Sequence, residues 1–477
     1  MKKSCYWKRR YGYLCTVMLA LITLCFAACK DDSEQGEEPF DPSKPLQITD
    51  FVPKEGGFGS NIVLYGNNFG NDPAKLKVTV GGKQANIISV KNKSLFCVIP
   101  QRAYDGDIQI SVCDDNGDEI AYAEAEATFT YVKKWLVTTY IGQHYENAND
   151  AVEKEGAFDD CGYIKKPFWL SFDPKSNFDH LYLTTHDGGY CRLFDLKEET
   201  VHFLNQFSKN DRPAIINWSI DEKKDMIVSR DLDPAGDVNV RYSRTSNFKE
   251  ATVLTEKNNK KYKAITGAMI HPENGELYFT TYNEQEIYRY DMETKEVTTS
   301  SKHLRTKETT RLVVHPSGKF AYMMRSYCSN GNGYIARMDY DYNAKRFSEP
   351  YIFVGTEASG YADGVGNSAR LNGPGQGVFV KNPDYEGEED EYDFYFCDEK
   401  NNCIRMLTPI GKVTTFAGRG NGIAAGGYAD GELRTEARFN APLSIAYDEK
   451  RHCFYVGDSD GNGTNSKGYI RKIALEE

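Results

Sequence analysis

Apolar and polar residues alternate along residues 46–132 with the period of two that half-buried β-strands show. The clearest example is "KLKVTVGGKQANIISV", in which two alternating runs flank a Gly-Gly pair. Turn residues interrupt these runs at short intervals, as in "VPKEGG" and "DDNGD". Short alternating strands separated by such turns predict an antiparallel β-sandwich.

Residues 135–477 repeat a longer unit of about four short strands. "HLYLTTHDGGYCRLFDLKEETVHFL" at 180 resembles "ELYFTTYNEQEIYRYDMETKEVTTS" at 276. Aligning the second strand of each unit places six residues in one column, with separations of 45, 51, 44, 73 and 60: Tyr182, Ile227, Tyr278, Tyr322, Tyr395 and Tyr455. A four-stranded repeat of roughly 40–50 residues is typical of a propeller blade. The chain is therefore predicted to be all-β, with a six-bladed β-propeller after the sandwich.

The two ends of the repeat region complete one blade between them. "WLVTTYIG" (135–142) resembles the outer strand "KVTTFAG" (412–418), yet no inner strands directly precede it. The last unit, 440–474, has the pattern of only three strands. We predict that 135–141 supplies its fourth strand, which closes the ring and removes the open sheet edges.

The first 28 residues have the pattern of a signal peptide. Five basic residues precede the apolar run Leu14–Ala27, which is too short to span a bilayer. Two alanines then precede Cys29, and this resembles a bacterial lipobox, which implies lipidation of Cys29; an ordinary signal peptide is the alternative. Residues 29–45 are acidic, contain Gly and Pro, and predict a flexible tether.

Charge and composition narrow the class of partner. The net charge is −11, and removing residues 1–28 takes away five basic groups and no acids, which leaves −16. This balance argues against nucleic acids and anionic membranes as partners, so only the lipid anchor is expected to touch a membrane. Aromatic residues make up 13% of the chain, with 32 Tyr, which fits an all-β protein that faces carbohydrate.

The sandwich resembles the IPT/TIG immunoglobulin-like family. The resemblance lies in Pro53 and Gly57, "GNNFG" (66–70), "VIP" (98–100) and "FTY" (129–131). In that family such a domain is usually a spacer or an interaction module.

The propeller resembles the NHL-repeat propellers. The matching motifs are "GYADGVGNSARLNGP" (360–374), "GYADGELRTEARFNAP" (427–442) and the hairpin "FYFCDEKNNCIRML". "KDD" (30–32) resembles the acidic export signal of Bacteroidetes surface lipoproteins, with retention on the inner face as the alternative. The combination resembles outer-membrane lipoproteins of gut Bacteroidetes, often encoded with polysaccharide-uptake systems, and implies that the chain faces the cell exterior.

Eight cysteines follow Cys29, and none has paired CxxC spacing, so a zinc ribbon is not expected. Cys397 and Cys403 flank "DEKNN", which is predicted to be a hairpin loop. The pair can form a cross-strand disulfide or remain as two buried thiols.

Motifs for catalysis are sparse. The sequence has no HExxH and no GxSxG motif. His271 and His315 precede proline in the turns between first and second strands, and they recur because the turn recurs, which indicates a structural role. No catalytic residue is predicted.

A weak calcium motif is present. "DSDGNG" (458–463) copies the first half of a calcium loop and offers Asp458, Asp460 and Asn462 as ligands. Tyr469 stands where the bidentate Glu belongs, and a polar hairpin loop is the alternative. No other cofactor is predicted.

Six residues end the second strands and are predicted to ring the mouth of the channel: Thr185, Arg230, Thr281, Arg325, Asp398 and Asp458. The two aspartates match the NHL pattern and are expected to tie their own hairpins. Arg230 and Arg325 depart from that pattern and are candidates to bind an acidic group on a glycan. A salt bridge to a neighbouring carboxylate is the alternative.

Aromatic residues near this ring are candidates to stack on sugar rings. Tyr190, Tyr282 and Tyr327 lie in predicted loops, and Trp169 and Trp218 lie near first strands, where a core position is the alternative. Tyr361 and Tyr428 repeat with the blade, which indicates packing.

The pattern as a whole predicts a non-catalytic surface lipoprotein that binds a polysaccharide or oligosaccharide beside an outer-membrane uptake transporter. This function rests on the family resemblance and the anchor. A protein-interaction module would instead need an apolar or charged patch on the propeller. A carbohydrate-active enzyme would need two carboxylates that converge in the channel.

Overall fold

The computed structural model describes residues 38–100, 103–143, 152–185, 190–205, 207, 212–231, 238–255, 262, 264–302, 307–327, 333–461 and 466–476. Two compact units are present, which meet in sequence between Lys134 and Trp135. The predicted signal peptide, Cys29 and the export signal lie outside the described residues. None of the described helices is long and apolar enough to cross a membrane.

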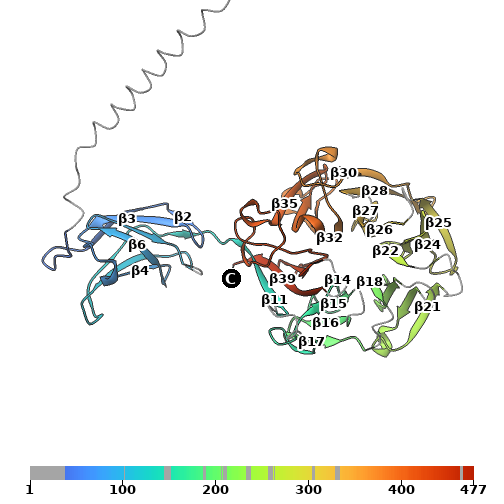
Figure 1. The fold of residues 1–477 in the computed structure, drawn as a ribbon, viewed down its shortest axis with the longest axis horizontal. Coiled ribbons are helices and arrows are strands. Elements are labelled where there is room, and N and C mark those ends of the chain that lie inside the picture. Colours follow the sequence, from blue (N-terminus) through green and yellow to red (C-terminus); the bar gives the residue numbers. More distant parts are fainter. Residues whose placement is uncertain are drawn as a thin grey trace, which may run out of the picture. The chain divides into compact units, whose positions relative to one another are not determined.

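The first unit is a sandwich of two four-stranded antiparallel sheets (Figure 1). One sheet has the order β1 (Gln47–Val52), β3 (Asn61–Asn67), β7 (Ser94–Val98) and β6 (Asn86–Lys91). The other has the order β5 (Lys83–Gln84), β4 (Leu76–Val80), β8 (Ile108–Cys113) and β9 (Glu119–Glu124). Two short strands, β2 (Glu55–Gly56) and β10 (Thr130–Tyr131), pair in parallel.

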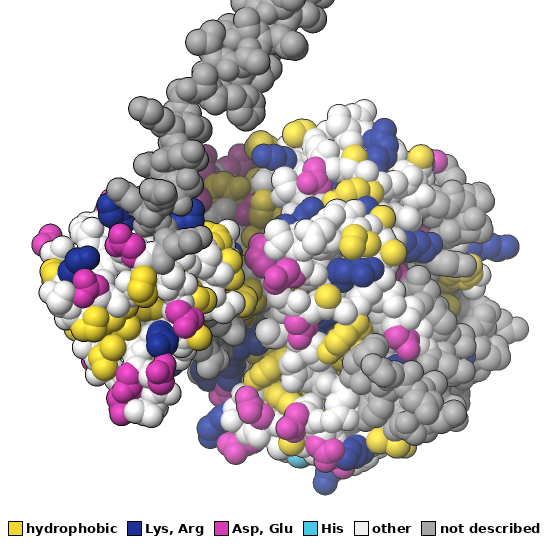
Figure 2. All heavy atoms as spheres, turned by 60° about the vertical axis from the view of Figure 1, so that its left-hand side comes forward, with side chains coloured by type: hydrophobic (Ala, Val, Ile, Leu, Met, Phe, Trp, Pro, Cys, Tyr) yellow, Lys and Arg dark blue, Asp and Glu magenta, His cyan; other side chains and the backbone are white. Residues whose placement is uncertain are grey.

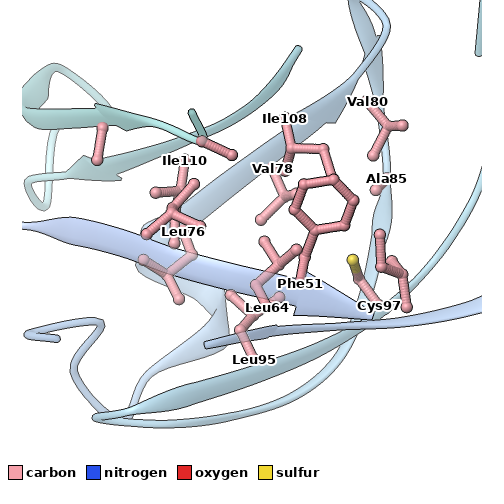
Figure 3. Packing of buried hydrophobic residues seen from close by; sticks show 14 of the residues in the cluster. Phe51, Leu64, Leu76, Val78, Val80, Ala85, Leu95, Cys97, Ile108 and Ile110 are labelled. Atoms are coloured by element: carbon pink, nitrogen blue, oxygen red, sulfur yellow. The ribbon is translucent and has the colours of Figure 1, made fainter. Parts of the chain in front are cut away.

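The core of the sandwich follows the alternation read from the sequence. Every second residue of β3 and β4 is buried, and Leu64, Val78 and Ile110 point with Phe51 into the space between the sheets (Figure 3). Gly66 fits because a Cβ at this position would lie 1.9 Å from the Gln47 carbonyl oxygen. This close approach explains the first glycine of the "GNNFG" motif.

Asn68 of the same motif holds the segment that precedes the sandwich. Its Nδ2 donates to the carbonyls of Asp41 and Lys44, each at 2.9 Å, and its Oδ1 accepts from the Asp41 N–H. Phe40 packs against the core. Residues 38–45 are thus part of the first unit, which corrects the assignment of all of 29–45 to a tether. The sequence shows that this segment has few apolar residues. It does not show that Phe40 and the bonds of Asn68 are enough to hold the segment on the sandwich.

The second unit is a propeller, and its described residues form six sheets around a central axis (Figure 1). We call the interior along this axis, between the first strands of the blades, the channel. In each blade the first strand lies innermost and the fourth lies outermost. Blade 1 contains β14 (Pro167–Phe172), β15 (His180–Thr185), β16 (Arg192–Asp195) and β17 (Thr200–Phe203). Blade 2 contains β18 (Pro213–Trp218), β19 (Met226–Arg230), β20 (Asn239–Tyr242) and β21 (Ala251–Thr255). Blade 3 contains β22 (Ile265–Ile270), β23 (Leu277–Thr281), β24 (Glu286–Tyr290) and β25 (Val297–Lys302).

The other three blades follow the same order. Blade 4 contains β26 (Thr309–Val314), β27 (Phe320–Tyr327), β28 (Gly333–Asp341) and β30 (Tyr351–Thr356). Blade 5 contains β32 (Pro374–Lys381), β33 (Tyr392–Asp398), β34 (Cys403–Leu407) and β35 (Lys412–Gly418). Blade 6 contains β37 (Ser444–Asp448), β38 (Cys453–Ser459), β39 (Lys467–Leu475) and β11 (Trp135–Ile141). The prediction of a sandwich followed by a six-bladed propeller is confirmed.

Strand β11 closes the ring, as predicted from its likeness to β35. It pairs antiparallel with β39, from Trp135 opposite Leu475 to Ile141 opposite Ile470. Asp430 accepts a hydrogen bond from the Thr139 N–H at 2.9 Å, and Asp363 accepts one from the N–H of Thr415, which holds the same place in β35. The first strand of the propeller sequence therefore completes the last blade.

The seven described cysteines after Cys29 are buried and form no disulfide. Cys397 lies opposite Ile404, and Cys403 lies opposite Asp398, so the two thiols point to opposite faces of the hairpin. The buried-thiol alternative holds and the disulfide does not form. Burial raises the pKa of Cys97 to about 12 and that of Cys453 to about 11.

Ring closure makes a testable prediction about two adjacent residues of β11. Val137 is fully buried opposite Ile473, whereas Thr138 is exposed. Val137→Asp should lower the free energy of unfolding by about 3 kcal/mol or more, because it places an uncompensated charge in the core. Thr138→Asp should change it by no more than about 0.5 kcal/mol. Urea unfolding followed by circular dichroism measures both, and equal effects would contradict the closure.

The cysteines give a second prediction. The chain from residue 30 onward contains eight. Since only an accessible thiolate reacts, at most one thiol should react quickly with Ellman's reagent in the native protein. All eight should react after unfolding in guanidinium without reductant. A count of six in the unfolded protein would reveal a disulfide and contradict the assignment.

Candidate functional site

The channel is lined by the first strands of the blades. Each of β14, β18, β22, β26, β32 and β37 is the last strand of its sheet, and each contacts the next around the ring. Their inner edges therefore present backbone N–H and C=O groups without a partner strand. Buried backbone groups of this kind need other hydrogen-bond partners.

Side chains from neighbouring blades supply these partners. The donors bond to a carbonyl in the first strand of the adjacent blade, as follows: Trp169 Nε1 to Ile216 at 3.2 Å, Asn217 Nδ2 to Ala268 at 3.3 Å, Arg311 Nη1 to Thr266 at 2.9 Å, Ser326 Oγ to Pro374 at 2.7 Å, and Ser444 Oγ to Pro167 at 3.3 Å. The ring is thus joined blade to blade by hydrogen bonds as well as by packing.

Gln376 connects two blades that are not adjacent in the ring. Its Nε2 donates to the Leu170 carbonyl at 2.8 Å, and its Oε1 accepts from the Leu170 N–H at 2.9 Å. The same oxygen lies 3.3 Å from the Ile445 N–H. The amide reaches from blade 5 past blade 6 to blade 1 and acts as a one-residue strand along the free edge of β14.

Arg311 crosses the channel from blade 4 toward blade 1. Its guanidinium lies 4.2 Å from the ring centre of Phe168, a cation–π contact between opposite blades. Burial lowers the pKa of Arg311, while Glu399 and Asp231 oppose that effect. Burial raises the pKa of Glu399, and Lys166, Lys400 and Arg311 oppose it.

The two ends of the channel differ in composition. We call the end with the loops between second and third strands the loop end, and the end where first strands turn into second strands the turn end. At the turn end lies a cavity of about 420 Å³ that is rich in aromatic side chains, including Trp169 and Trp218. We call this cavity the bowl. A separate groove of about 660 Å³ lies beside blades 4 and 5 and is lined by many charged residues, including Lys319 and Glu388.

The loop end of blades 5 and 6 is held by a repeated buried ion network. Arg405 bonds Asp398 and Asp363, each at 2.9 Å. In blade 6, Arg471 bonds Asp458 at 3.3 Å and Asp430 at 2.6 Å. The rings of Tyr361 and Tyr428 each lie 5.1 Å from the corresponding guanidinium. The "GYADG" motifs and the aspartates that end the second strands thus serve the structure of their own blades, as expected.

The two arginine candidates have intramolecular partners. Arg325 is 1% exposed and forms an ion pair with Glu308 at 2.6 Å. Arg230 is half-buried and donates to the Tyr242 hydroxyl. Arg325 is therefore not the exposed anion-binding residue that the sequence allowed, because a glutamate just before β26 neutralises it. The salt-bridge alternative describes this residue.

The aromatic candidates are dispersed. Tyr190 stacks on Phe203 with ring centres 4.1 Å apart, and Tyr282 is half-buried at the end of blade 3. The Tyr327 side chain lies outside the described part of the chain. Trp169 is 6% exposed and lines the bowl, at the other end of the channel from Tyr282. Among the described candidates, Trp169 and Tyr282 therefore do not belong to one site.

The calcium candidates are only partly described. Asp458 is fully buried and its carboxylate accepts from Arg471 and from the Asn440 N–H at 2.9 Å. Asp460 accepts from the Lys467 N–H at 2.8 Å and closes its hairpin, while Asn462 lies outside the description. Among the described residues, no group of three His, Cys, Asp or Glu side chains is placed to hold a metal. The polar-hairpin alternative accounts for the two aspartates.

Residues 46–131 match the IPT/TIG domain family. An auxiliary nutrient binding protein from Bacteroides thetaiotaomicron is 45% identical, with a TM-score of 0.83 over 92% of this chain and 100% of that one. The chain belongs to the same family as this Bacteroides thetaiotaomicron protein.

Two further relatives have the same extent. An auxiliary nutrient binding protein from Bacteroides ovatus is 40% identical, covers 92% of this chain and all of its own, and has a TM-score of 0.69. A Bacteroides thetaiotaomicron protein with a provisional phosphatase name is 35% identical, covers 93% and 99%, and has a TM-score of 0.76. No match to a curated protein is found. The family thus combines a TIG domain with a propeller in one chain.

Within this family member, sequence reasoning missed the residues that shape the channel. Gln376 and Leu170 are separated by more than 200 positions, and no motif marks either one. Trp169 and Trp218 were singled out, but the sequence does not show that Tyr447 of blade 6 lines the same cavity. Phe172, Trp218 and Tyr447 lie at or next to the end of their first strands, and this recurrent position is the signal that could have found part of the bowl.

The histidines of the turns join adjacent blades, as their recurrence indicated. His271 is 1% exposed; its Nε2 lies 3.1 Å from the Gly318 carbonyl, and its Nδ1 accepts from the Glu273 N–H at 3.3 Å. This pattern fits the neutral ring, which has one donor and one acceptor. Burial lowers the pKa of His271.

This geometry predicts a pH dependence. The pKa of His271 is lower in the folded protein than in the unfolded protein, so its contribution to stability is fully present above about pH 6.5. That contribution is lost as the pH falls, by at most about 1.4 kcal/mol per pH unit for one proton. His271→Gln should reduce that slope between about pH 7 and pH 5, relative to wild type. The same change at the exposed His202 should leave it as it is. Urea unfolding at several pH values measures the slope, and equal slopes in all three proteins would exclude the role of His271.

Proposed function

We propose that the protein is a non-catalytic surface lipoprotein that captures a glycan nutrient for an outer-membrane uptake transporter. One observation carries this proposal. A protein named for auxiliary nutrient binding is 45% identical to this chain, and the match covers the whole of that protein and 92% of this chain. Identity at that level over both domains supports a shared role. The finer term, glycan, rests on the aromatic composition and on the resemblance to polysaccharide-uptake lipoproteins.

The anchor is part of the proposal. Cys29 follows a basic segment and a short apolar run, and "KDD" follows directly. Lipidation at Cys29 would hold the chain at the outer membrane, with both units outside the cell. A net charge of −16 after removal of residues 1–28 supports a solvent-exposed body that does not adhere to anionic lipid.

A hydrolase is the second candidate, because a buried guanidinium in the channel has acidic residues in its electrostatic surroundings. Glu399 and Asp231 are both electrostatic neighbours of Arg311, and burial raises the pKa of Glu399, as in many general acids. A relative with a provisional phosphatase name points in the same direction. Binding is preferred because Gln376 and the Arg311–Phe168 contact occupy the interior of the channel.

The proposal predicts binding without turnover. The chain from residue 30 onward, which lacks Cys29, should give saturable heat with at least one member of a panel of plant, host and microbial polysaccharides. No reducing sugar should be released in the same mixtures, and p-nitrophenyl phosphate should not be hydrolysed. Glu399→Gln is the matched control, because it should preserve binding but abolish any turnover that depends on this carboxyl.

Three other results would count against the proposal. Sugar release or phosphate release that disappears in Glu399→Gln would establish the hydrolase. Heat only with outer-membrane proteins would establish an interaction module. If no polysaccharide of the panel binds, the proposal that the nutrient is a glycan is wrong.

A further inference from the structure

The bowl at the turn end of the channel has the composition of a small ligand site. Three blades contribute aromatic side chains: Trp169, Phe172 and Phe178 from blade 1, Trp218 from blade 2, and Tyr447 from blade 6. Its volume of about 420 Å³ lies within the range of roughly 300–1,000 Å³ for small-molecule sites. The cavity is at the small end of that range, so it suits the end of a chain rather than a long polymer segment.

The polar groups of the bowl are few and mostly neutral. Ser171, Asn217 and Ser219 line it together with Gln376, and Lys224 is the one charged side chain among its described lining residues. The groove beside blades 4 and 5 is different, since it is lined by Lys319, Arg337, Lys412 and a series of acidic residues. Flat aromatic faces with scattered amides and hydroxyls match a neutral sugar ring, whose C–H face is apolar and whose hydroxyls need hydrogen bonds.

Gln376 forms part of the lining, and its bonds to Leu170 and Ile445 leave one of its hydrogen-bond donors available. A side-chain amide has two N–H donors, and among the described residues only the Leu170 carbonyl accepts from Nε2. The side chain is 4% exposed, so its remaining N–H needs an acceptor, and a ligand hydroxyl or a water molecule in the bowl can supply it. The same amide thus joins the blades and offers a donor to the bowl.

The rim of the bowl is held in place before any ligand arrives. Phe178 has φ of +61°, a conformation that costs energy for a bulky residue, and its ring packs 5.1 Å from that of Phe172. Arg451 of blade 6 donates to the Phe178 carbonyl at 2.8 Å and pairs with Asp179 at 2.8 Å. Lys450 also pairs with Asp179, at 2.7 Å. A fixed rim lowers the entropic cost of binding.

We infer that the bowl binds the terminal sugar unit of a neutral oligosaccharide. This inference rests on the proposed function, to which it adds the site and the ligand class. It places the ligand at the turn end, opposite to the loop-end tyrosines that the sequence favoured. The ring packs between the aromatic side chains of blades 1, 2 and 6, and its hydroxyls bond to the neutral polar groups beside them.

Tryptophan fluorescence tests the location directly. The chain from residue 30 onward has three tryptophans, Trp135, Trp169 and Trp218, and the last two line the bowl. In a Trp135→Phe background, emission reports only on the bowl. We would titrate this protein with maltohexaose, cellohexaose, xylohexaose and mannohexaose, and with oligogalacturonate and chondroitin sulfate oligosaccharides as charged probes. A neutral probe should shift the emission with the same midpoint as the calorimetric titration.

Two matched tyrosine variants provide the control. Tyr447 lines the bowl, and Tyr282 lies at the loop end, while both are half-buried. Tyr447→Ala should weaken binding of the neutral probe at least tenfold, and Tyr282→Ala should change it less than twofold. Thermal unfolding of each variant verifies that it is folded, and the fluorescence titration needs neither substitution.

Each other outcome is decisive. Calorimetric binding without an emission change, unaffected by Tyr447→Ala, would overturn the bowl as the site and leave the proposed function intact. Binding of charged probes alone would overturn the ligand class. If no probe and no polysaccharide of the larger panel binds, the proposed function fails, and this inference fails with it.

Discussion

Each blade of the propeller presents the inner edge of its first strand to the channel, and those backbone groups must find hydrogen-bond partners. Serine, asparagine, arginine, tryptophan and glutamine side chains from adjacent blades provide them. Gln376 does so across a whole intervening blade. These side chains lie in the interior of the channel, between the first strands of the blades. The bowl lies at the turn end of the same channel, and Gln376 lines it.

The same need to satisfy buried polar groups governs the loop end. Arg405 and Arg471 are fully buried, and each is paired with two aspartates, one from the second strand and one from the loop before the blade. An unpaired buried charge would be strongly destabilising, so each set is retained as a unit. Asp458 belongs to a calcium-like motif when read along the sequence, yet its carboxylate bonds to Arg471 of its own blade. Over the face shown in Figure 2, charged side chains of both signs lie among hydrophobic ones on both units.

The sequence predicted the architecture well because the signals were periodic. Alternation marked the sandwich, a repeated column of residues marked six blades, and the likeness of 135–141 to 412–418 marked the closing strand. Candidate ligands were harder, since their exposure depends on partners elsewhere in the chain. Glu308 neutralises Arg325, and Asn68 draws residues 41–44 onto the sandwich, and neither contact has a local pattern. The bowl could not be predicted, because the sequence does not show that Trp169, Trp218 and Tyr447 line one cavity.

The closing strand β11 also affects the order in which the chain can fold during synthesis. It is the first part of the propeller to be synthesised, and its partner β39 is the last. The sandwich has all its strands by Tyr131 and can fold on its own contacts, whereas blade 6 stays incomplete until the C-terminal strand exists. Pairing strands so distant in sequence is slow, because a long loop must close first. An unfinished or truncated chain would therefore expose β11 as an unpaired edge, so intact synthesis of the last residues also protects the protein from aggregation.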